Sequence, residues 1–325
     1  MASAISKNAL IGGETFRSSR QGRCASRCRS ASFIASGCAR DRIPMDPVVT
    51  AIVLASAFMH AVWNVLVKVD GDRLMAMAVI AGLTAVLSPV LIVFSPPIAA
   101  QAWKYLLMSV ALNNLYFFLL IESYRFGDLS HAYPLARGSA PVLVALGSAI
   151  FAGERLGPGS VAGVLLVSAG IMSLVAGSRF DPKTRRRAIG YPLATGATIA
   201  AYTVVDGIGV RQSGSPLGYI GWLFALFAFP IVLTAIVSRR ARAIDFLRAR
   251  WRPAGLAALF NFGSYGLAIF ALSLGAMAHV SALRETSVVI AALIGTLVLK
   301  EPFGRTRIAA ALLVAAGVVT IHLTG

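Results

Sequence analysis

A few ionisable side chains lie inside long apolar stretches of this sequence. Asp206 is a lone carboxylate within one such stretch, Arg137 and Arg284 stand near the start of two others, and Glu285 follows Arg284 directly. Ionisable groups in a hydrocarbon environment are rare, and they usually face a partner, a substrate or an ion pathway. These four residues are therefore the first candidates for a functional site.

The chemistry open to these groups is solute recognition and proton transfer. A guanidinium group can form paired hydrogen bonds with an anionic or zwitterionic solute, so Arg137 and Arg284 are candidate ligands. Asp206, Glu285 or the histidines can carry a proton, if transport is coupled to one. A structural interpretation stands beside this one: Arg284 pairs with Glu285, and Arg137 reaches Asp206 or a carbonyl group at a helix end.

Other polar and aromatic residues within the apolar stretches extend the candidate site. We expect spans one, four, six and nine to line a central cavity. The predicted cavity residues are His60, Trp63, Asn64, Asn113, Asn114, Tyr133, Arg137, Tyr202, Asp206, Asn261, Tyr265, Arg284 and Glu285. Asn113 and Asn114 have an alternative role as hydrogen-bonding groups between helices. His131 and His279 are expected to cap helix ends at the membrane interface. We predict no catalytic residues, cofactor or metal.

The elements that must position these residues are membrane helices. The chain is 57% hydrophobic and 13% charged, whereas a soluble domain carries about 25% charged residues. A membrane span needs about 20 apolar residues, and only helices satisfy their backbone in lipid at that length. The sequence predicts an all-α integral membrane protein with ten transmembrane helices: about 48–68, 74–95, 102–122, 130–151, 158–177, 189–210, 217–237, 254–274, 277–299 and 305–323.

The second half of the chain repeats the first. Residues 132–157 align with 280–304, which predicts two repeats, 46–177 and 189–325. Because each repeat has five spans, the second must enter the bilayer from the opposite side, giving two inverted five-helix repeats with a cavity between them. The alignment matches Arg137 with Arg284, Glu154 with Glu301, Gly157 with Gly304 and Gly170 with Gly317.

The turns after the duplicated spans have expected structural roles. Glu154 and Glu301 are predicted to cap the following helix or to pair with Arg155 and Lys300. The spacing of Gly159 and Gly163 is typical of close packing between membrane helices.

Basic residues indicate the orientation of the chain. After Met45, the loops between spans fall into two sets on opposite sides of the membrane. One set is rich in arginine, above all in 178–188 and 238–253, whereas the other carries only Lys104, Arg155 and Arg211. The positive-inside rule places the arginine-rich loops in the cytoplasm and both termini outside. Residues 238–252 either lie against anionic lipid headgroups or form a solvated basic loop. The net charge of +17 thus indicates a membrane surface, and we predict no nucleic-acid partner.

Residues 1–44 differ from the rest of the chain. They are rich in arginine, serine and alanine, and they hold all three cysteines, Cys24, Cys28 and Cys38. This composition is typical of an organellar transit peptide or of a disordered basic arm. A third interpretation is that translation starts at Met45 and that the extension has no function.

Three segments resemble a known family over residues 46–325. FMHAVWNVLVK (58–68), AAYTVVDGIGVRQSG (200–214) and GAMAHVSALRETSVVIAALIGTLVLKEPFG (275–304) are similar to the EamA repeat of the drug/metabolite transporter superfamily. The resemblance implies a secondary carrier, often an exporter of amino acids, metabolites or drugs, with a central cavity between its halves. It also implies cytoplasmic termini, in conflict with the charge pattern. We expect a bacterial inner membrane protein, with a homodimer as one possible assembly.

The sequence lacks the signatures of other functions. It has no GxxxxGK[ST] loop for ATP and no HExxH or GxSxG motif. One alternative to a transporter is a polytopic membrane enzyme, but its acidic residues would have to cluster, and here they are scattered. The other is a channel, a lipid-handling protein or a scaffold, which would not require charged residues inside both halves.

Overall fold

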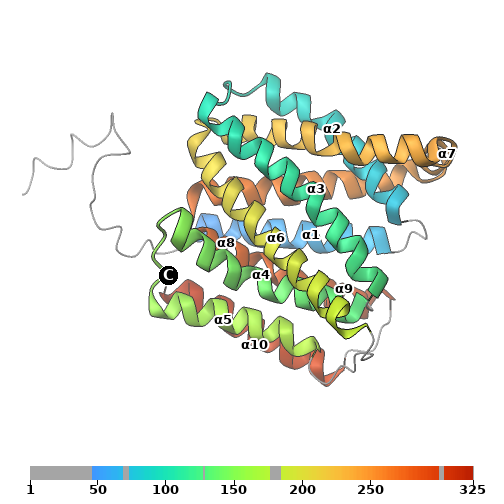
Figure 1. Ribbon diagram of the computed structural model, residues 1–325. Helices are drawn as coiled ribbons and strands as arrows, with labels where there is room; N and C mark the ends of the chain where they lie inside the picture. The colour runs from blue at the N-terminus through green and yellow to red at the C-terminus, as the bar shows by residue number, and fades with distance from the viewer. Residues whose placement is uncertain (1–45, 69–72, 127–128, 176–183, 300–303, 325) are drawn as a thin grey trace, which may run out of the picture. The chain divides into compact units, whose positions relative to one another are not determined.

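The computed structural model describes residues 46–68, 73–126, 129–175, 184–299 and 304–324, and these residues contain helices without any β-strand (Figure 1). Two segments discussed above lie outside the described residues. They are the extension 1–44 and residues 300–303, which include Glu301. The helices are α1 (Pro47–Lys68), α2 (Arg73–Val93), α3 (Trp103–Phe126), α4 (Leu129–Phe151), α5 (Pro158–Met172), α6 (Arg185–Gln212), α7 (Pro216–Leu274), α8 (Met277–Arg284), α9 (Thr286–Leu299) and α10 (Arg305–Thr324). Two 3-10 turns, η1 (Ala100–Ala102) and η2 (Ser173–Val175), join them.

Ten helical segments in the described chain are long and apolar enough to cross a membrane, and each overlaps one predicted span. The chain is therefore an all-helical integral membrane protein, as the sequence predicts. The segments are Pro47–Val67, Ala76–Val93, Ala100–Phe126, His131–Phe151, Pro158–Val175, Arg185–Gln212, Pro216–Thr234, Arg248–Leu274, Met277–Ile294 and Arg305–Thr324.

Helix α7 contains two of these spans, which lie side by side. The rings of Phe224 and Phe262 stack with their centroids 4.6 Å apart. In one straight helix they would be separated by roughly 57 Å, at about 1.5 Å per residue. The chain therefore turns back between Thr234 and Arg248, as the gold and orange segments of Figure 1 show. The backbone of this connection is helical, but the side chains of 238–247 lie outside the description, so the lipid contact expected for 238–252 stays a prediction.

The ninth span is broken at Glu285. Helix α8 ends at Arg284, the backbone N–H of Glu285 bonds to the carbonyl groups of Ala282 and Leu283, and α9 begins at Thr286. Its counterpart in the sequence repeat, α4, is a single helix although it contains two prolines. The duplicated spans therefore differ at the position where the charged residues lie.

The helix contacts come in matched pairs. Helix α1 packs against α7 and α9, while α6 packs against α3 and α4. The contact of α1 with the second span of α7 includes two reciprocal hydrogen bonds: the Ser56 hydroxyl donates to the Ser264 carbonyl oxygen at 2.7 Å, and the Ser264 hydroxyl donates to that of Ser56 at 3.0 Å. In two inverted repeats, α6 would be equivalent to α1, α3 to the second span of α7, and α4 to α8 with α9. The contacts are consistent with this arrangement.

Helices α5 and α10 approach each other through glycines. A Cβ atom on Gly163 would lie 2.8 Å from the carbonyl oxygen of Gly317, and one on Gly317 would lie 2.7 Å from that of Gly163. Gly159 similarly faces Thr324. This confirms the packing role predicted for Gly159 and Gly163.

Candidate functional site

Three cavities meet at Arg137, which lines all of them. Their volumes are about 430, 100 and 20 Å³. Helices of both halves contribute: α1, α2, α3, α4 and α5 from the first, and α6, α7, α8, α9 and α10 from the second. Among them are α1, α4, α6 and the span formed by α8 and α9, which are the four spans that the sequence assigned to a central cavity.

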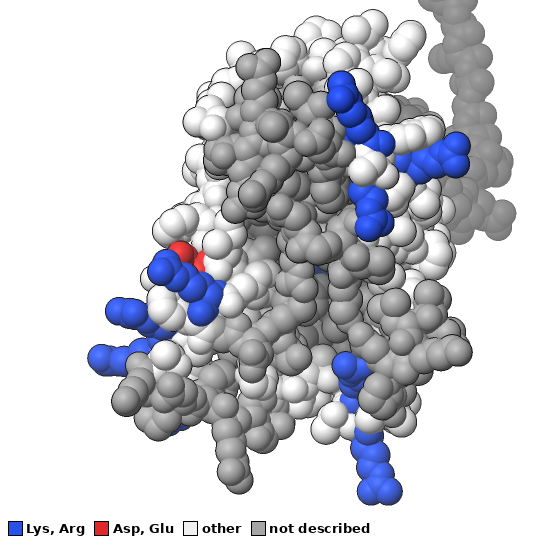
Figure 2. All heavy atoms as spheres, turned by 90° about the vertical axis from the view of Figure 1, so that its right-hand side faces the viewer, with Lys and Arg blue, Asp and Glu red and all other residues white. Residues whose placement is uncertain are grey.

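The 430 Å³ cavity lies toward one end of the spans. It is lined by Val67 near the end of α1, Tyr133 near the start of α4 and Thr306 in the first turn of α10. These helix ends lie toward the right in Figure 1. Exposed arginines lie at the start of α10, the end of α3, the start of α6 and the start of the second span of α7, and we call this the basic end. They are Arg125, Arg185, Arg186, Arg187, Arg248, Arg250, Arg252 and Arg305. Figure 2 looks onto it and shows lysine and arginine side chains spread over its described surface.

Arg137 forms a buried ion pair with Glu285. The Arg137 Nε and Glu285 Oε2 atoms are 3.0 Å apart, and the two residues are only 7% and 2% exposed. A second guanidinium nitrogen of Arg137 donates to the Ser287 hydroxyl at 3.4 Å. The pair joins α4 to the break between α8 and α9, so it connects the two halves.

The expected structural pairs of the arginines were wrong. No ion pair joins Arg284 to Glu285, or Arg137 to Asp206, among the described residues. The physical reason lies in helix geometry, because consecutive side chains on a helix point about 100° apart. Glu285 consequently faces α4, whereas Arg284 faces α7.

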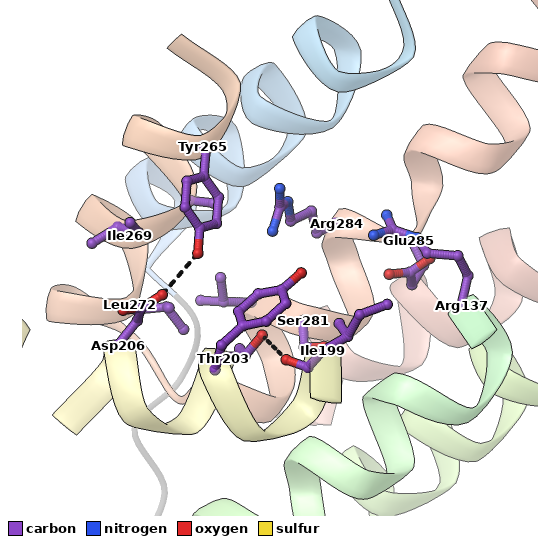
Figure 3. Close-up of a pocket in the computed structure, with 13 residues that line it drawn as sticks. Arg137, Ile199, Thr203, Asp206, Tyr265, Ile269, Leu272, Ser281, Arg284 and Glu285 are labelled. Carbon is purple, nitrogen blue, oxygen red and sulfur yellow. Dashed lines mark hydrogen bonds and ion pairs between the residues drawn. The ribbon is translucent and has the colours of Figure 1, made fainter. Parts of the chain in front are cut away.

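Arg284 has no carboxylate within 4 Å in the described part of the chain. Its guanidinium carbon lies 5.3 Å from the centroid of the Tyr265 ring, in the range of a cation–π contact. Its Nε is buried and has no hydrogen-bond partner. Figure 3 shows this side chain between Tyr265 and the Arg137–Glu285 pair. Arg284 lines the 100 and 20 Å³ cavities.

Asp206 is held by hydroxyl groups. It is 1% exposed, and its Oδ1 atom accepts a hydrogen bond from Tyr219 at 3.0 Å. Its Oδ2 atom accepts one from Tyr265 at 2.8 Å, which Figure 3 shows. These bonds tie α6 to both spans of α7. Of the three cavities Asp206 lines only that of 20 Å³, which shares Tyr202 and Tyr265 with the 100 Å³ cavity.

Aromatic rings form one wall of the 100 Å³ cavity. Tyr202 lies edge-on to Tyr116 and to Tyr265, with centroids 6.0 and 6.3 Å apart, and Phe224 lies edge-on to Tyr265 at 5.9 Å. The sequence analysis did not select Tyr116 or Phe224. Tyr116 follows Asn113 by about one helical turn, a spacing that could have found it. Phe224 carries no such signal, because phenylalanine is ordinary in membrane spans.

The structure brings the other predicted residues to the cavities, except one. Trp63 donates to the His60 Nδ1 atom at 3.3 Å, and both line the two larger cavities. Asn114 lines none of the three and donates to its own helix, at the carbonyl oxygen of Val110. The remaining residues of the prediction line at least one cavity: Asn64, Asn113, Tyr133 and Asn261.

The opposite end of the spans is fastened by Glu154. Its carboxylate lies 2.8 Å from the Arg211 guanidinium and accepts the backbone N–H of Met277 at 2.9 and 3.2 Å. Arg211 also donates to the carbonyl oxygens of Leu272 at 2.9 Å and Gly275 at 2.6 Å. We call Glu154, Arg211 and the N-terminus of α8 the clasp. It joins the α4–α5 connection of the first half to the second half.

Two predictions about this end are corrected. Glu154 caps α8 and pairs with Arg211, rather than capping α5 or pairing with Arg155, because the left-handed Gly153 (φ 67°) turns the chain at the end of α4 and leaves Glu154 facing the other half. His279 caps no helix end: it is buried within α8, which α1, α4 and α5 enclose, and its Nε2 atom has no hydrogen-bond partner in the described chain.

The comparisons with known proteins agree with this geometry. Residues 187–323 match the model of the EamA-like transporter family. The chain contains an EamA domain. This domain belongs to the drug/metabolite transporter superfamily and covers the second half. No curated protein sequence matches the chain. One crystal structure of a protein aligns with 85% of this chain and 96% of its own, with a TM-score of 0.63 and 17% identity, which shows a shared fold across both halves.

Proposed function

We propose that this EamA-domain protein is a secondary transporter in which two repeats, 46–177 and 189–325, move a small solute by alternating access. The solute would be a metabolite, an amino acid or a drug-like molecule. The family match supports a transporter embedded in a membrane. The cavity of about 430 Å³ is lined by residues of both halves, and it falls within the range of about 300–1,000 Å³ that is usual for small-molecule sites.

The observation that carries this proposal is the contrast between the two ends of the spans. The large cavity lies at the basic end, and the clasp closes the other end with an ion pair and four hydrogen bonds from the Met277 N–H and Arg211. A carrier must expose its site to one side at a time, and this arrangement corresponds to one such state. Release to the other side requires that the clasp open.

The charge pattern supports export. Under the positive-inside rule the basic end faces the cytoplasm, so the large cavity receives its solute from there and delivers it past the clasp. We place the protein in the inner (plasma) membrane of a bacterium, where transport in this direction is efflux from the cell. Asp206 is the group that we propose to carry a proton if transport is coupled to one, because it is buried and close to the cavities.

The test is uptake into proteoliposomes that contain the full chain. A mixed metabolite pool is offered with and without a pH gradient to wild type, to Asp206→Asn, and to Glu122→Gln as a control, since Glu122 pairs with Arg125 within α3. We expect accumulation that needs the gradient and is lost only in Asp206→Asn. Flux that is unaffected by gradient and substitution would contradict proton coupling, and absence of flux for every solute would contradict transport.

A further inference from the structure

The charges around the 20 and 100 Å³ cavities are not matched one to one. Arg137 is neutralised by Glu285 at 3.0 Å. Asp206 does not line the 100 Å³ cavity, and its carboxylate accepts hydrogen bonds from two tyrosine hydroxyls. Arg284 reaches the 100 Å³ cavity and has no carboxylate within 4 Å in the described chain. The cavity thus presents one positive charge that the surrounding residues leave unpaired.

The sequence repeat explains why Arg284 has no partner. Arg137 and Arg284 occupy equivalent positions, and the residue that neutralises Arg137 is the one that follows Arg284. By the same symmetry, a partner for Arg284 would follow Arg137, but that residue is Gly138. A Cβ atom on Gly138 would lie 2.8 Å from Met172 Cγ. A carboxylate is therefore absent at this position, and Met172 occupies the space beside it.

An unpaired cation inside a membrane protein is unfavourable, and such groups usually serve a solute or an ion. A guanidinium group is suited to carboxylates because its planar fork can form two parallel hydrogen bonds with them. The buried Nε of Arg284, which lacks a partner, is one of these donors. An anionic group of the solute would satisfy both the charge and this donor.

The walls beside Arg284 determine what the rest of the solute can be. Aromatic rings predominate, with the amides of Asn113 and Asn261 as polar groups. Flat, apolar surfaces of this kind pack against apolar or aromatic groups. The rings that line the cavity are those of Trp63, Tyr116, Phe117, Tyr202, Phe224, Phe227 and Tyr265.

We propose that Arg284 binds the carboxylate of the transported solute, and that this solute is a small organic monoanion with an apolar or aromatic body. The proposal rests on the proposed transport function, whose substrate class it specifies. Arg137 acts as a positioning residue, because its ion pair holds the α8–α9 break, and with it Arg284, in place.

Binding to the purified full-length protein in detergent tests this proposal. The probe is radiolabelled phenylacetate in equilibrium dialysis, with the neutral isostere phenylacetamide for comparison. We expect saturable binding of phenylacetate, a loss of tenfold or more in Arg284→Gln, a smaller loss in Arg284→Lys and no change in Arg155→Gln, an exposed arginine outside the cavities. Equal binding in Arg284→Gln, equal affinity for phenylacetamide, or no binding by the wild type would overturn the proposal.

Thermal unfolding without ligand separates this role from a structural one. Removing an uncompensated charge should leave the unfolding temperature of Arg284→Gln equal to or above that of the wild type, and added phenylacetate should raise it only in the wild type. A clear fall in Arg284→Gln would assign Arg284 to the fold instead.

The outcomes also distinguish the two proposals. Phenylacetate that binds through Arg284 without any flux would support the anion site and contradict transport. Flux confined to neutral or cationic solutes, unchanged in Arg284→Gln, would contradict the anion site and leave transport standing.

Discussion

Arg137 and Glu285 form an ion pair between the two halves, with Nε and Oε2 3.0 Å apart. Each residue is nearly free of solvent contact, so neither charge has water as an alternative partner. The pair fixes the break between α8 and α9 against α4. It also decides which of the two arginines, equivalent in the sequence repeat, is left without a carboxylate partner.

Removing one partner of this pair should destabilise the protein strongly. Arg137→Gln or Glu285→Gln leaves the other charge buried and uncompensated, and each should lower the free energy of unfolding by about 3–5 kcal/mol. The double substitution Arg137→Met with Glu285→Met should cost much less than the sum. Chemical or thermal unfolding in detergent measures all three. Additive losses would show that the two side chains do not interact.

Weakening the clasp should open the end that it closes. Glu154→Gln removes the ion pair with Arg211, and charge-assisted hydrogen bonds contribute about 1.5–3 kcal/mol each. The chain after Met45 has no cysteine. Ser281→Cys, with the three native cysteines replaced by serine, therefore gives a single reporter within α8, at a residue that lines the 20 Å³ cavity. An impermeant maleimide added on the clasp side should label it roughly tenfold faster, since 1.4 kcal/mol corresponds to about a factor of ten.

The control for that experiment is Glu122→Gln, which removes an ion pair with Arg125 within α3, near the basic end. It should leave the labelling rate of Ser281→Cys unchanged. Equal rates in wild type and Glu154→Gln would show that Glu154 does not hold this end closed.

The two tyrosine hydroxyls on Asp206 should each contribute to stability. Tyr219→Phe and Tyr265→Phe remove one donor each from a buried carboxylate, at a cost of about 1–3 kcal/mol. In the Asp206→Asn background both losses should shrink, because a neutral amide needs its partners less than a carboxylate does. Double-mutant cycles on unfolding measure the coupling, and a coupling near zero would mean that the hydrogen bonds add nothing.

The glycine contact between α5 and α10 should not tolerate a larger side chain. Gly163→Val places its Cβ atom 2.8 Å from the Gly317 carbonyl oxygen, and overpacking of this kind costs about 1–3 kcal/mol. Gly157→Ala is the matched control, since no atom lies within 4 Å of its added Cβ and its φ is −66°. The unfolding temperature should fall in the first variant alone. A similar fall in both would exclude the contact as its cause.

Most of the span pattern could be predicted, because apolar length is a local property of the sequence. The predicted residues other than Asn114 line the cavities, because a polar group in a span usually faces inward; that they bind a solute stays a prediction. Asn114 differs because its amide bonds to the Val110 carbonyl oxygen one turn back, which satisfies it without a neighbour.

The partners of the charged residues could not be predicted. Arg137 meets Glu285, and Glu154 meets Arg211, across the contact between halves. Such pairs depend on how helices far apart in sequence are rotated against each other. The repeat showed which residues are equivalent, but equivalence does not say which residues touch.

The glycine that follows Arg137 has a consequence for how such a carrier can be built. Two identical five-span chains, paired head to tail, would carry the same residue after both arginines, so both would be neutralised or both would be free. One free and one neutralised arginine requires two halves that differ in sequence, as Gly138 and Glu285 do in this chain. The residues at positions 138 and 285 then determine how many arginines are unpaired, and so which solute charge is preferred. A glycine at 285 would leave two unpaired arginines, which suit a dianion. Solute preference could thus shift through one codon, with the surrounding walls unchanged.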